Sequence, residues 1–326
     1  MNTDAQILSA LRAAGAGGVS GVELAQRLGI SRAAVWARIE ELRRLGYEIE
    51  ASPVHGYRLV RAPDLLHADD LLARLGKTRV IGRDIRVFEQ TTSTSDVVEK
   101  LARDGVPEGV VVFAEAQTHG RGRLGREWFS PPRKGLWFSV LLRPPLRPQQ
   151  ATQLTIAAAT ALVRAIKLQT GLTPEIKWPN DILLGGKKLA GVLTELSAEL
   201  DRTKYVILGV GIDVNVGAKE FPAELRRIAT SLRIETGQVI DRPELAVRVL
   251  REFDADYTKV CSGDFAAVAE EWERRCTTLG RHVAIRIGTR LVRGRAESLA
   301  PDGALLLRTQ HGHIERIVGG DVTIEG

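Results

Sequence analysis

Apolar positions near the start of the chain repeat with helical spacing, each time after a capping signal. Residues 3–14 follow this pattern, and Thr3 with Gln6 predicts a reciprocal capping box at their start. A second box, Ser20 with Glu23, predicts another helix, which ends at a glycine two turns later. The pattern therefore indicates two short helices in succession.

A third helix is expected after a tight glycine turn. Ser31 supplies its cap, and Gly46 marks its end. Its inner face is predicted to consist of Val35, Ile39 and Leu42. Three short helices with a tight turn before the third predict a helix-turn-helix motif.

The pattern then changes to strands. Runs at 47–50 and 57–60, joined by turn-forming residues 52–56, resemble the wing of a winged helix-turn-helix. A new helix is predicted over residues 64–75, so we expect the first domain to cover residues 1–62.

The middle of the chain mixes strand and helix patterns without strict alternation. The predicted strands are 85–89, 110–116, 136–143, 182–184, 192–195 and 205–216, and the predicted helices are 95–104, 149–170, 243–260 and 265–275. Because the strands are not each separated by a helix, we expect a mixed sheet with helices on one side rather than a doubly wound Rossmann domain. This domain is predicted over residues 63–277.

From about residue 279 the pattern contains only strands and turns. Strands are predicted at 282–287, 290–298, 304–308 and 314–318. We therefore expect a small β-barrel over residues 278–326 and an α+β fold class for the whole chain.

Composition narrows the protein class. With 326 residues, 44% hydrophobic and 26% charged, the chain has the make-up of a globular protein with two or three domains. It lacks the ~18 uninterrupted apolar residues of a membrane span, and residues 1–11 lack the features of a secretory signal. The two cysteines, Cys261 and Cys276, form no CxxC or Cys/His cluster. We expect a cytoplasmic protein with no membrane partner, no disulfide framework and no zinc site.

The net charge of +6 permits an anionic partner but is too small to identify one, so the positions of the basic residues matter more. Residues 120–128 read GRGRLGREW, in which arginines alternate with glycines. Glycine lets the backbone approach a ligand closely, and guanidinium groups bind phosphate or carboxylate in a forked geometry. We interpret this segment, the Gly-rich loop, as a phosphate-binding loop. The alternative is a merely flexible basic surface loop.

Three weaker motifs accompany the loop. The run 177–181 (KWPND), followed by 187–191 (KKLAG), places charged groups at the ends of neighbouring strands, either as a buried scaffolding pair or around a nucleotide. Residues 92–95 (TSTS) are typical of N-capping and can also bind a polar ligand. Residues 209–215 (GVGIDVN) indicate a strand that a backbone or a ligand approaches closely.

Together and in this order, these motifs resemble those of the biotin protein ligases, in the bifunctional bacterial form that also represses biotin synthesis. The resemblance covers essentially the whole chain. It implies a winged helix-turn-helix domain, a catalytic domain of the biotin/lipoate ligase type and an SH3-like C-terminal barrel. It also implies biotin and ATP as substrates, Mg²⁺, and a biotin carboxyl carrier protein as acceptor.

The resemblance assigns roles to individual residues. It implies biotin contacts at Ser93, Thr94, Gln117, Arg121, Gly122, Arg123 and Lys188, and nucleotide contacts at Arg123, Arg126, Trp128, Asn180 and Asp181. Ser95 is a further candidate binding residue because it stands beside Thr94 in the same motif. The residues implied for catalysis are Lys188, Arg123, Arg121 and Asp181, with Asp181 as the metal ligand. One position departs from the family, because this chain has Ser95 where an asparagine is common, and a serine offers no amide.

The implied reaction forms biotinyl-5′-AMP and then transfers biotin to a lysine, without a covalent enzyme intermediate. This agrees with the lack of an obvious nucleophile-base pair in the sequence. Catalysis would rest on positioning and charge stabilisation. Because an acyl-adenylate hydrolyses easily, we expect residues 117–128 to act as a lid that becomes ordered on ligand binding.

The exposed face of the third helix is predicted to carry Ser31, Arg32, Trp36, Arg38 and Arg43, side chains suited to a DNA major groove and its phosphates. We therefore expect operator DNA as a partner, bound by a ligand-promoted homodimer, as the resemblance implies. The alternative is a winged helix that serves as a protein-interaction module.

Two rival functions remain open. A lipoate ligase would share the fold and the acyl-adenylate chemistry, but the Gly-rich loop and the helix-turn-helix argue against it. A transcription factor that senses biotin without catalysis is disfavoured by the presence of both Lys188 and Asp181.

Overall fold

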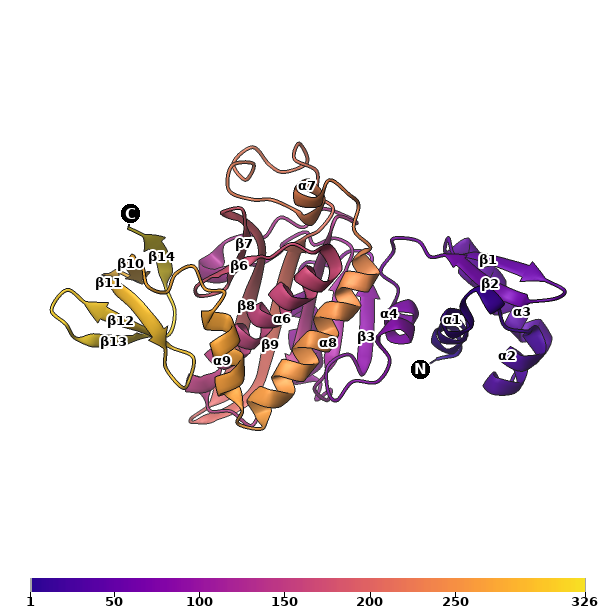
Figure 1. The fold of residues 1–326 in the computed structure, drawn as a ribbon. Helices are drawn as coiled ribbons and strands as arrows, with labels where there is room; N and C mark the ends of the chain where they lie inside the picture. Colours follow the sequence, from indigo (N-terminus) through magenta and orange to yellow (C-terminus); the bar gives the residue numbers. More distant parts are fainter. Residues whose placement is uncertain (1, 326) are drawn as a thin grey trace. The chain divides into compact units, whose positions relative to one another are not determined.

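The computed structural model describes residues 2–325, which form two compact units (Figure 1). The first unit runs to Lys77 and also contains Asp241–Val247. The second unit contains Thr78–Ile240 and the chain from Arg248 onward. The first unit thus extends past residue 62, where the sequence pattern placed the end of the first domain.

The first unit contains the predicted winged helix-turn-helix. Its elements are α1 (Thr3–Ala14), α2 (Gly21–Leu28), α3 (Arg32–Arg44), β1 (Glu48–Ser52) and β2 (Gly56–Arg61), with β1 and β2 antiparallel. Ser20 and Ser31 cap α2 and α3 as predicted, and the inner stripe of α3 is fully buried. The predicted Thr3 box is wrong, because the Asn2 side chain accepts from the Ala5 N–H and caps α1 instead.

The helix predicted from residue 64 begins later, as α4 (Ala68–Leu75). The Asp64 carboxylate accepts from Arg242 Nε at 3.0 Å, and its carbonyl oxygen accepts from Arg242 Nη2 at 2.9 Å. The Asp64 backbone thus binds Arg242, and α4 begins only after His67, which has extended backbone angles and is the N-cap.

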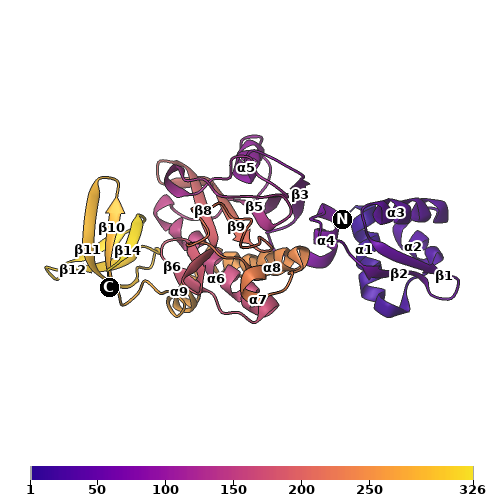
Figure 2. The ribbon, with the colours of Figure 1, turned by 90° about the horizontal axis from the view of Figure 1, so that it is seen from above.

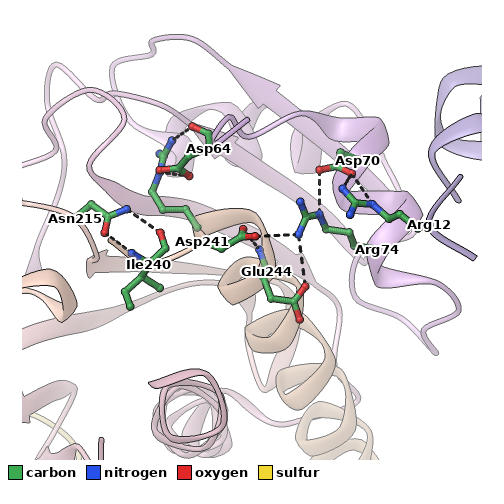
Figure 3. Close-up of polar contacts among 9 residues, drawn as sticks. Arg12, Asp64, Asp70, Arg74, Asn215, Ile240, Asp241 and Glu244 are labelled. Carbon is green, nitrogen blue, oxygen red and sulfur yellow. Dashed lines mark hydrogen bonds and ion pairs between the residues drawn. The ribbon is translucent and has the colours of Figure 1, made fainter. Parts of the chain in front are cut away.

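Figure 3 shows the charged network of the first unit. Asp70 of α4 is 1% exposed and accepts from Arg12 of α1 at 2.5 Å and from Arg74 at 3.0 Å. Arg74 also reaches Asp241 at 3.4 Å and Glu244 at 3.6 Å. A buried carboxylate requires such counter-charges, and this pairing brings residues 241–247 into the first unit.

The second unit is built on the predicted mixed sheet of seven strands, in the order β3-β4-β5-β9-β8-β7-β6. The strands are β3 (Asp84–Phe88), β4 (Val110–Ala114), β5 (Gly135–Leu142), β6 (Glu175–Lys177), β7 (Asp181–Leu184), β8 (Lys187–Glu199) and β9 (Arg202–Asp213). Only β3 and β4 pair in parallel. The pattern missed β6 because three residues are too few to show a period.

Helices cover both faces of this sheet, which corrects the expected one-sided arrangement. The helices are α5 (Thr94–Arg103), α6 (Thr152–Thr170), α7 (Leu232–Thr236), α8 (Arg242–Cys261) and α9 (Phe265–Glu273). Figure 2 shows α5 on one face and α6 with α8 on the other. Val98 of α5 packs against Val110 and Val112, while Arg164 of α6 pairs with Asp256 of α8 and Glu271 of α9.

Helix α6 begins later than the predicted residue 149, after a 3₁₀ turn at Pro148–Gln150. The short α7, capped by Ser231, was not predicted.

The C-terminal strands form an antiparallel sheet in the order β13-β12-β11-β10-β14. They are β10 (His282–Ile287), β11 (Arg290–Leu299), β12 (Leu305–Thr309), β13 (Ile314–Ile317) and β14 (Asp321–Ile324), of which only β14 was not predicted. In the residues described, β13 and β14 do not pair, so the sheet remains open between its two edges. No helix in residues 2–325 is long and apolar enough to cross a bilayer.

Candidate active site and recognition helix

Buried hydroxyl groups gather at the N-terminus of α5. Ser93, Thr94 and Ser95 are each at most 3% exposed, and the Ser93 side chain accepts from the Ser95 N–H as the predicted cap. The hydroxyls of Thr94 and Ser95 lie 2.8 Å and 3.0 Å from Ser139 Oγ of β5. Sequence analysis did not identify Ser139, because a single serine within an apolar strand carries no motif.

Gln117 joins this cluster as predicted. Its Oε1 accepts from the Thr94 N–H at 2.9 Å, and its Nε2 donates to Ser130 Oγ at 2.9 Å. These two bonds fix the orientation of the amide. Ser130 is a second contributor that the sequence motifs did not reveal.

Glycines on β8 and β9 allow other side chains to approach the sheet closely. A β-carbon on Gly211 would lie 2.5 Å from the Trp128 indole, and one on Gly191 would lie 3.0 Å from it. A β-carbon on Gly209 would lie 3.1 Å from Ser95 Oγ. The close approach predicted for residues 209–215 is therefore made by the side chains of Trp128 and Ser95.

Lys188 on β8 and Asp181 on β7 form an ion pair with Nζ and Oδ1 2.7 Å apart. The Lys188 ammonium also lies 5.2 Å from the centroid of the Trp128 ring. The side chains of Lys188 and Asp181 are 37% and 26% exposed. The Lys188–Asp181 pair is therefore not the fully buried scaffolding pair that was one interpretation of the sequence, and both groups remain accessible to a ligand.

Arg123 of the Gly-rich loop reaches the KWPND segment. Its Nη1 donates to Asn180 Oδ1 at 3.1 Å, and the Asn180 amide in turn donates to the Val192 carbonyl at 2.8 Å. Burial lowers the pKa of the Arg123 guanidinium, and the carboxylates of Asp321 and Asp181 oppose this shift. An arginine remains charged through such a shift, so Arg123 brings a fixed positive charge to Asn180.

The other two loop arginines, unlike Arg123, bind carboxylates. Arg121 donates to Asp96 at 2.6 Å and to Glu195 at 3.0 Å. Arg126 donates to Asp321 at 2.6 Å.

The loop closes on itself and lines a hollow. The Gly122 N–H donates to the Arg126 carbonyl at 2.7 Å. The hollow, of about 430 Å³, is lined by the loop, Leu193 and Glu195. A larger hollow of about 660 Å³ beside Arg143 contains none of the predicted site residues in its lining.

Asp213, at the end of β9, was not predicted as a site residue. It is 5% exposed, and among the described residues its Oδ1 has no hydrogen-bond partner. Burial raises the pKa of this carboxyl well above its usual value, while the charge of Lys188 opposes the shift. An unpartnered buried carboxyl near a lysine is a signal of a functional site, but burial cannot be seen in the sequence.

Asp181 is the predicted metal ligand. Within residues 2–325 no three His, Cys, Asp or Glu side chains group closely enough to hold a metal. Asp181 instead offers a single carboxylate. Mg²⁺ is commonly held by one or two carboxylates together with substrate phosphates and water, so Asp181 fits a magnesium ion that arrives with a nucleotide.

The recognition helix α3 presents some of its predicted residues to solvent. Arg32 and Arg38 are exposed, and Trp36 is 57% exposed. Ser31 caps the helix, and Arg38 Nε lies 3.7 Å from Asp4. Arg43 points elsewhere, because its guanidinium donates to the Ile49 carbonyl and to Glu40.

Family sequence models match three segments of the chain. A helix-turn-helix domain matches residues 4–58, the biotin/lipoate A/B protein ligase family matches residues 87–213, and the biotin protein ligase C-terminal domain matches residues 278–324.

Similar proteins extend the match to nearly the whole chain. The bifunctional ligase/repressor BirA of Bacillus subtilis is 40% identical over 94% of each chain, and that of Escherichia coli is 30% identical over 94% of this chain and 92% of its own. The solved biotin protein ligase of Aquifex aeolicus, in complex with biotin and ATP, is 31% identical, with a TM-score of 0.63. That match covers 74% of this chain and 99% of the Aquifex chain.

The matched segments contain the hydroxyl cluster, the Gly-rich loop and the Lys188–Asp181 pair, and they are preceded by a helix-turn-helix domain. This chain therefore belongs to the biotin protein ligase family, as one of its bifunctional ligase/repressor members.

Proposed function

We propose that the site activates biotin with ATP and transfers it to a lysine of a biotin carboxyl carrier protein. The observation that carries this proposal is the meeting of two cations at adjacent residues. Arg123 from the Gly-rich loop reaches Asn180, and Lys188 from β8 reaches Asp181. Positive charges that contact two consecutive residues, Asn180 and Asp181, suit a carboxylate reacting with a phosphate.

In the first half-reaction, a biotin carboxylate oxygen attacks the α-phosphorus of ATP. The bond to the β-phosphate breaks, and pyrophosphate leaves with the electron pair. Lys188 and Arg123 stabilise the negative charge on the carboxylate and the α-phosphate. No protein nucleophile takes part, so the contribution of the chain is positioning and electrostatics.

In the second half-reaction, the ε-amine of the acceptor lysine attacks the acyl carbon and AMP leaves. The bond between the acyl carbon and the AMP oxygen breaks, AMP keeps its electron pair, and the amine passes its proton to solvent as the amide forms. Water must be excluded before the acceptor arrives, and the Gly-rich loop is the segment placed to do so.

The other proposed contacts follow the family resemblance. The hydroxyls of Ser93, Thr94 and Ser95, with Gln117, supply donors and acceptors for the polar ring of biotin. Arg121, Gly122, Arg126 and Trp128 complete the surroundings of the adenylate. Asp181 would hold Mg²⁺, which supplies charge neutralisation at the phosphates when bound.

Exchange of labelled pyrophosphate into ATP tests the enzyme proposal. Exchange should require biotin and should not occur when lipoate replaces it. Exchange with lipoate alone would assign a lipoate ligase instead. Binding of biotin without any exchange would favour a sensor that lacks catalysis.

A second function, repression through operator DNA, is favoured by the exposed face of α3. Trp36 is a large aromatic residue that the domain core leaves in solvent, beside the exposed Arg32. Arg32→Ala should weaken binding to operator DNA without changing pyrophosphate exchange. A protein-interaction module would show no loss of DNA affinity.

A further inference from the structure

The segment 319–321 of the C-terminal sheet meets the Gly-rich loop. Arg126 Nη2 donates to Asp321 Oδ2 at 2.6 Å. Asp321 is the first residue of β14 and pairs with Arg286 of β10 in the ladder. Its backbone position is therefore set by the C-terminal sheet and not by the loop that it contacts.

A second arginine of the loop faces the same segment. A β-carbon on Gly319 would lie 3.0 Å from Arg123 Nη2, so a side chain at this position would push the guanidinium by a few tenths of an ångström. The charge of Asp321 also acts on Arg123 and opposes the lowering of its pKa by burial. This is the arginine that reaches Asn180.

We infer that Asp321 is a positioning residue of the ligase site, which holds Arg126 and thereby keeps Arg123 of the same loop at Asn180. The C-terminal domain then completes the lid over the adenylate. This inference rests on the proposed ligase function. It adds a role for the β13–β14 turn that none of the sequence motifs indicated.

The expected effect of removing Asp321 is small, because the Arg126–Asp321 ion pair is largely exposed to solvent. The side chains of Arg126 and Asp321 are 66% and 38% exposed. An ion pair of this kind shifts an equilibrium by no more than about fivefold. Loss of Asp321 should therefore leave the fold intact and change the lifetime of the closed loop by a factor of about two to five.

The first experiment compares full-length Asp321→Asn with wild type after biotinyl-AMP has formed from biotin and ATP. Escape of the adenylate should be about two- to fivefold faster in the variant. Glu315→Gln is the matched control, because it breaks an exposed pair with Arg290 in the same sheet. The control should release adenylate at the wild-type rate.

Two further variants separate positioning from a general loss of structure. In a double-mutant cycle, Asp321→Asn should add nothing once Arg126→Gln is present, because the two act as one pair. Gly319→Ala alters no charge, yet it should also speed release by displacing Arg123. Additive effects in the cycle, or release at the wild-type rate from Gly319→Ala, would overturn the inference.

Trypsin cleavage of the loop gives a readout that does not depend on activity. Cleavage after Arg121, Arg123 or Arg126 should be about two- to fivefold faster in Asp321→Asn than in wild type or Glu315→Gln. An absence of biotin-dependent exchange in wild type would refute the proposed function and leave this result standing. Unchanged cleavage, or faster cleavage with unchanged adenylate release, would refute the positioning role of Asp321.

Discussion

Lys188 and Asp213 show how the environment decides the role of a charged residue. Lys188 remains partly exposed and is paired with Asp181, so its ammonium group is available to a ligand. Asp213 is buried without a hydrogen-bond partner for Oδ1 in the described chain, so its carboxyl is held protonated more strongly. Lys188 is thus available to bind a ligand, whereas the buried carboxyl of Asp213 favours its neutral form.

Lys188→Ala should nearly abolish formation of biotinyl-AMP. Removal of a cation beside the reacting carboxylate and phosphate costs a few kcal/mol of transition-state stabilisation, or about a hundredfold or more in rate. Single-turnover synthesis of the adenylate measures this. Lys187→Ala, a change at the exposed neighbouring lysine, is the control and should remain active. A Lys188→Ala rate within threefold of wild type would rule out the proposed role.

Asp213→Asn should raise the free energy of unfolding at neutral and higher pH. Because burial raises the pKa of Asp213 in the folded state, the folded protein holds this proton more tightly than the unfolded chain. The corresponding stability is present below the unfolded pKa and is lost as pH rises through the folded pKa. An asparagine does not titrate.

Denaturant unfolding of wild type and Asp213→Asn across a pH series measures this difference. The two free energies should diverge as pH rises, with wild type losing more stability. Parallel curves over the whole series would show that Asp213 is not held protonated.

At the scale of elements, the paired strands β8 and β9 form a platform for Trp128. Gly191 and Gly211 face each other across this ladder, and both approach the indole. The Trp128 ring in turn lies beside the Lys188 ammonium. The glycines of two strands therefore set the position of a loop residue and, through it, the surroundings of the lysine.

Gly211→Ala should reduce adenylate formation at least tenfold, because the new methyl group would overlap the indole at 2.5 Å and displace Trp128. Overpacking of this kind costs about 1–3 kcal/mol, so the thermal midpoint should also fall. The rate of adenylate synthesis and thermal unfolding measure the two effects. Gly17→Ala is the control, because a β-carbon there would meet no atom within 4 Å beyond its immediate chain neighbourhood. Equal activity of Gly211→Ala and wild type would contradict the platform.

At the scale of the whole molecule, one chain carries a ligase site in the second unit and a recognition helix in the first. A single helix-turn-helix motif reads one half-site, and paired motifs bind half-sites about 34–36 Å apart or a multiple of that distance. A dimer would therefore bind a two-fold symmetric operator much more tightly than a monomer.

We expect operator binding to strengthen when biotin and ATP are both present. Ligand drives dimerisation only through a preference for the dimer, and each ~1.4 kcal/mol of preference shifts the equilibrium tenfold. Titration of operator DNA with the protein, with both substrates and with neither, measures the coupling beside sedimentation of the same samples. Equal affinity and an unchanged monomer fraction would show a constitutive DNA binder or a protein-contact module.

The sequence alone determined the elements and motifs whose signals are local. Capping serines, the inner stripe of α3, most of the strands and the alternation of arginine with glycine all depend on residues a few positions apart. Such patterns can be recognised in the sequence because the helix and strand periods span only a few residues. That Lys188 and the Gly-rich loop belong to one site is a prediction from the family resemblance of their motifs.

Only the tertiary structure decided which distant residues meet. Ser139 and Asp321 lie in strands without a motif, whereas Asp213 lies in the 209–215 motif, which indicated a close approach but no site residue. The folded chain brings these three residues close to Thr94, Asp321's partner Arg126 and the charge of Lys188. Conversely, Arg43 is a residue type that suits contacts with DNA, but its guanidinium donates to the Ile49 carbonyl and to Glu40. Burial and pairing are properties of the folded chain, because they depend on every element that packs around a residue.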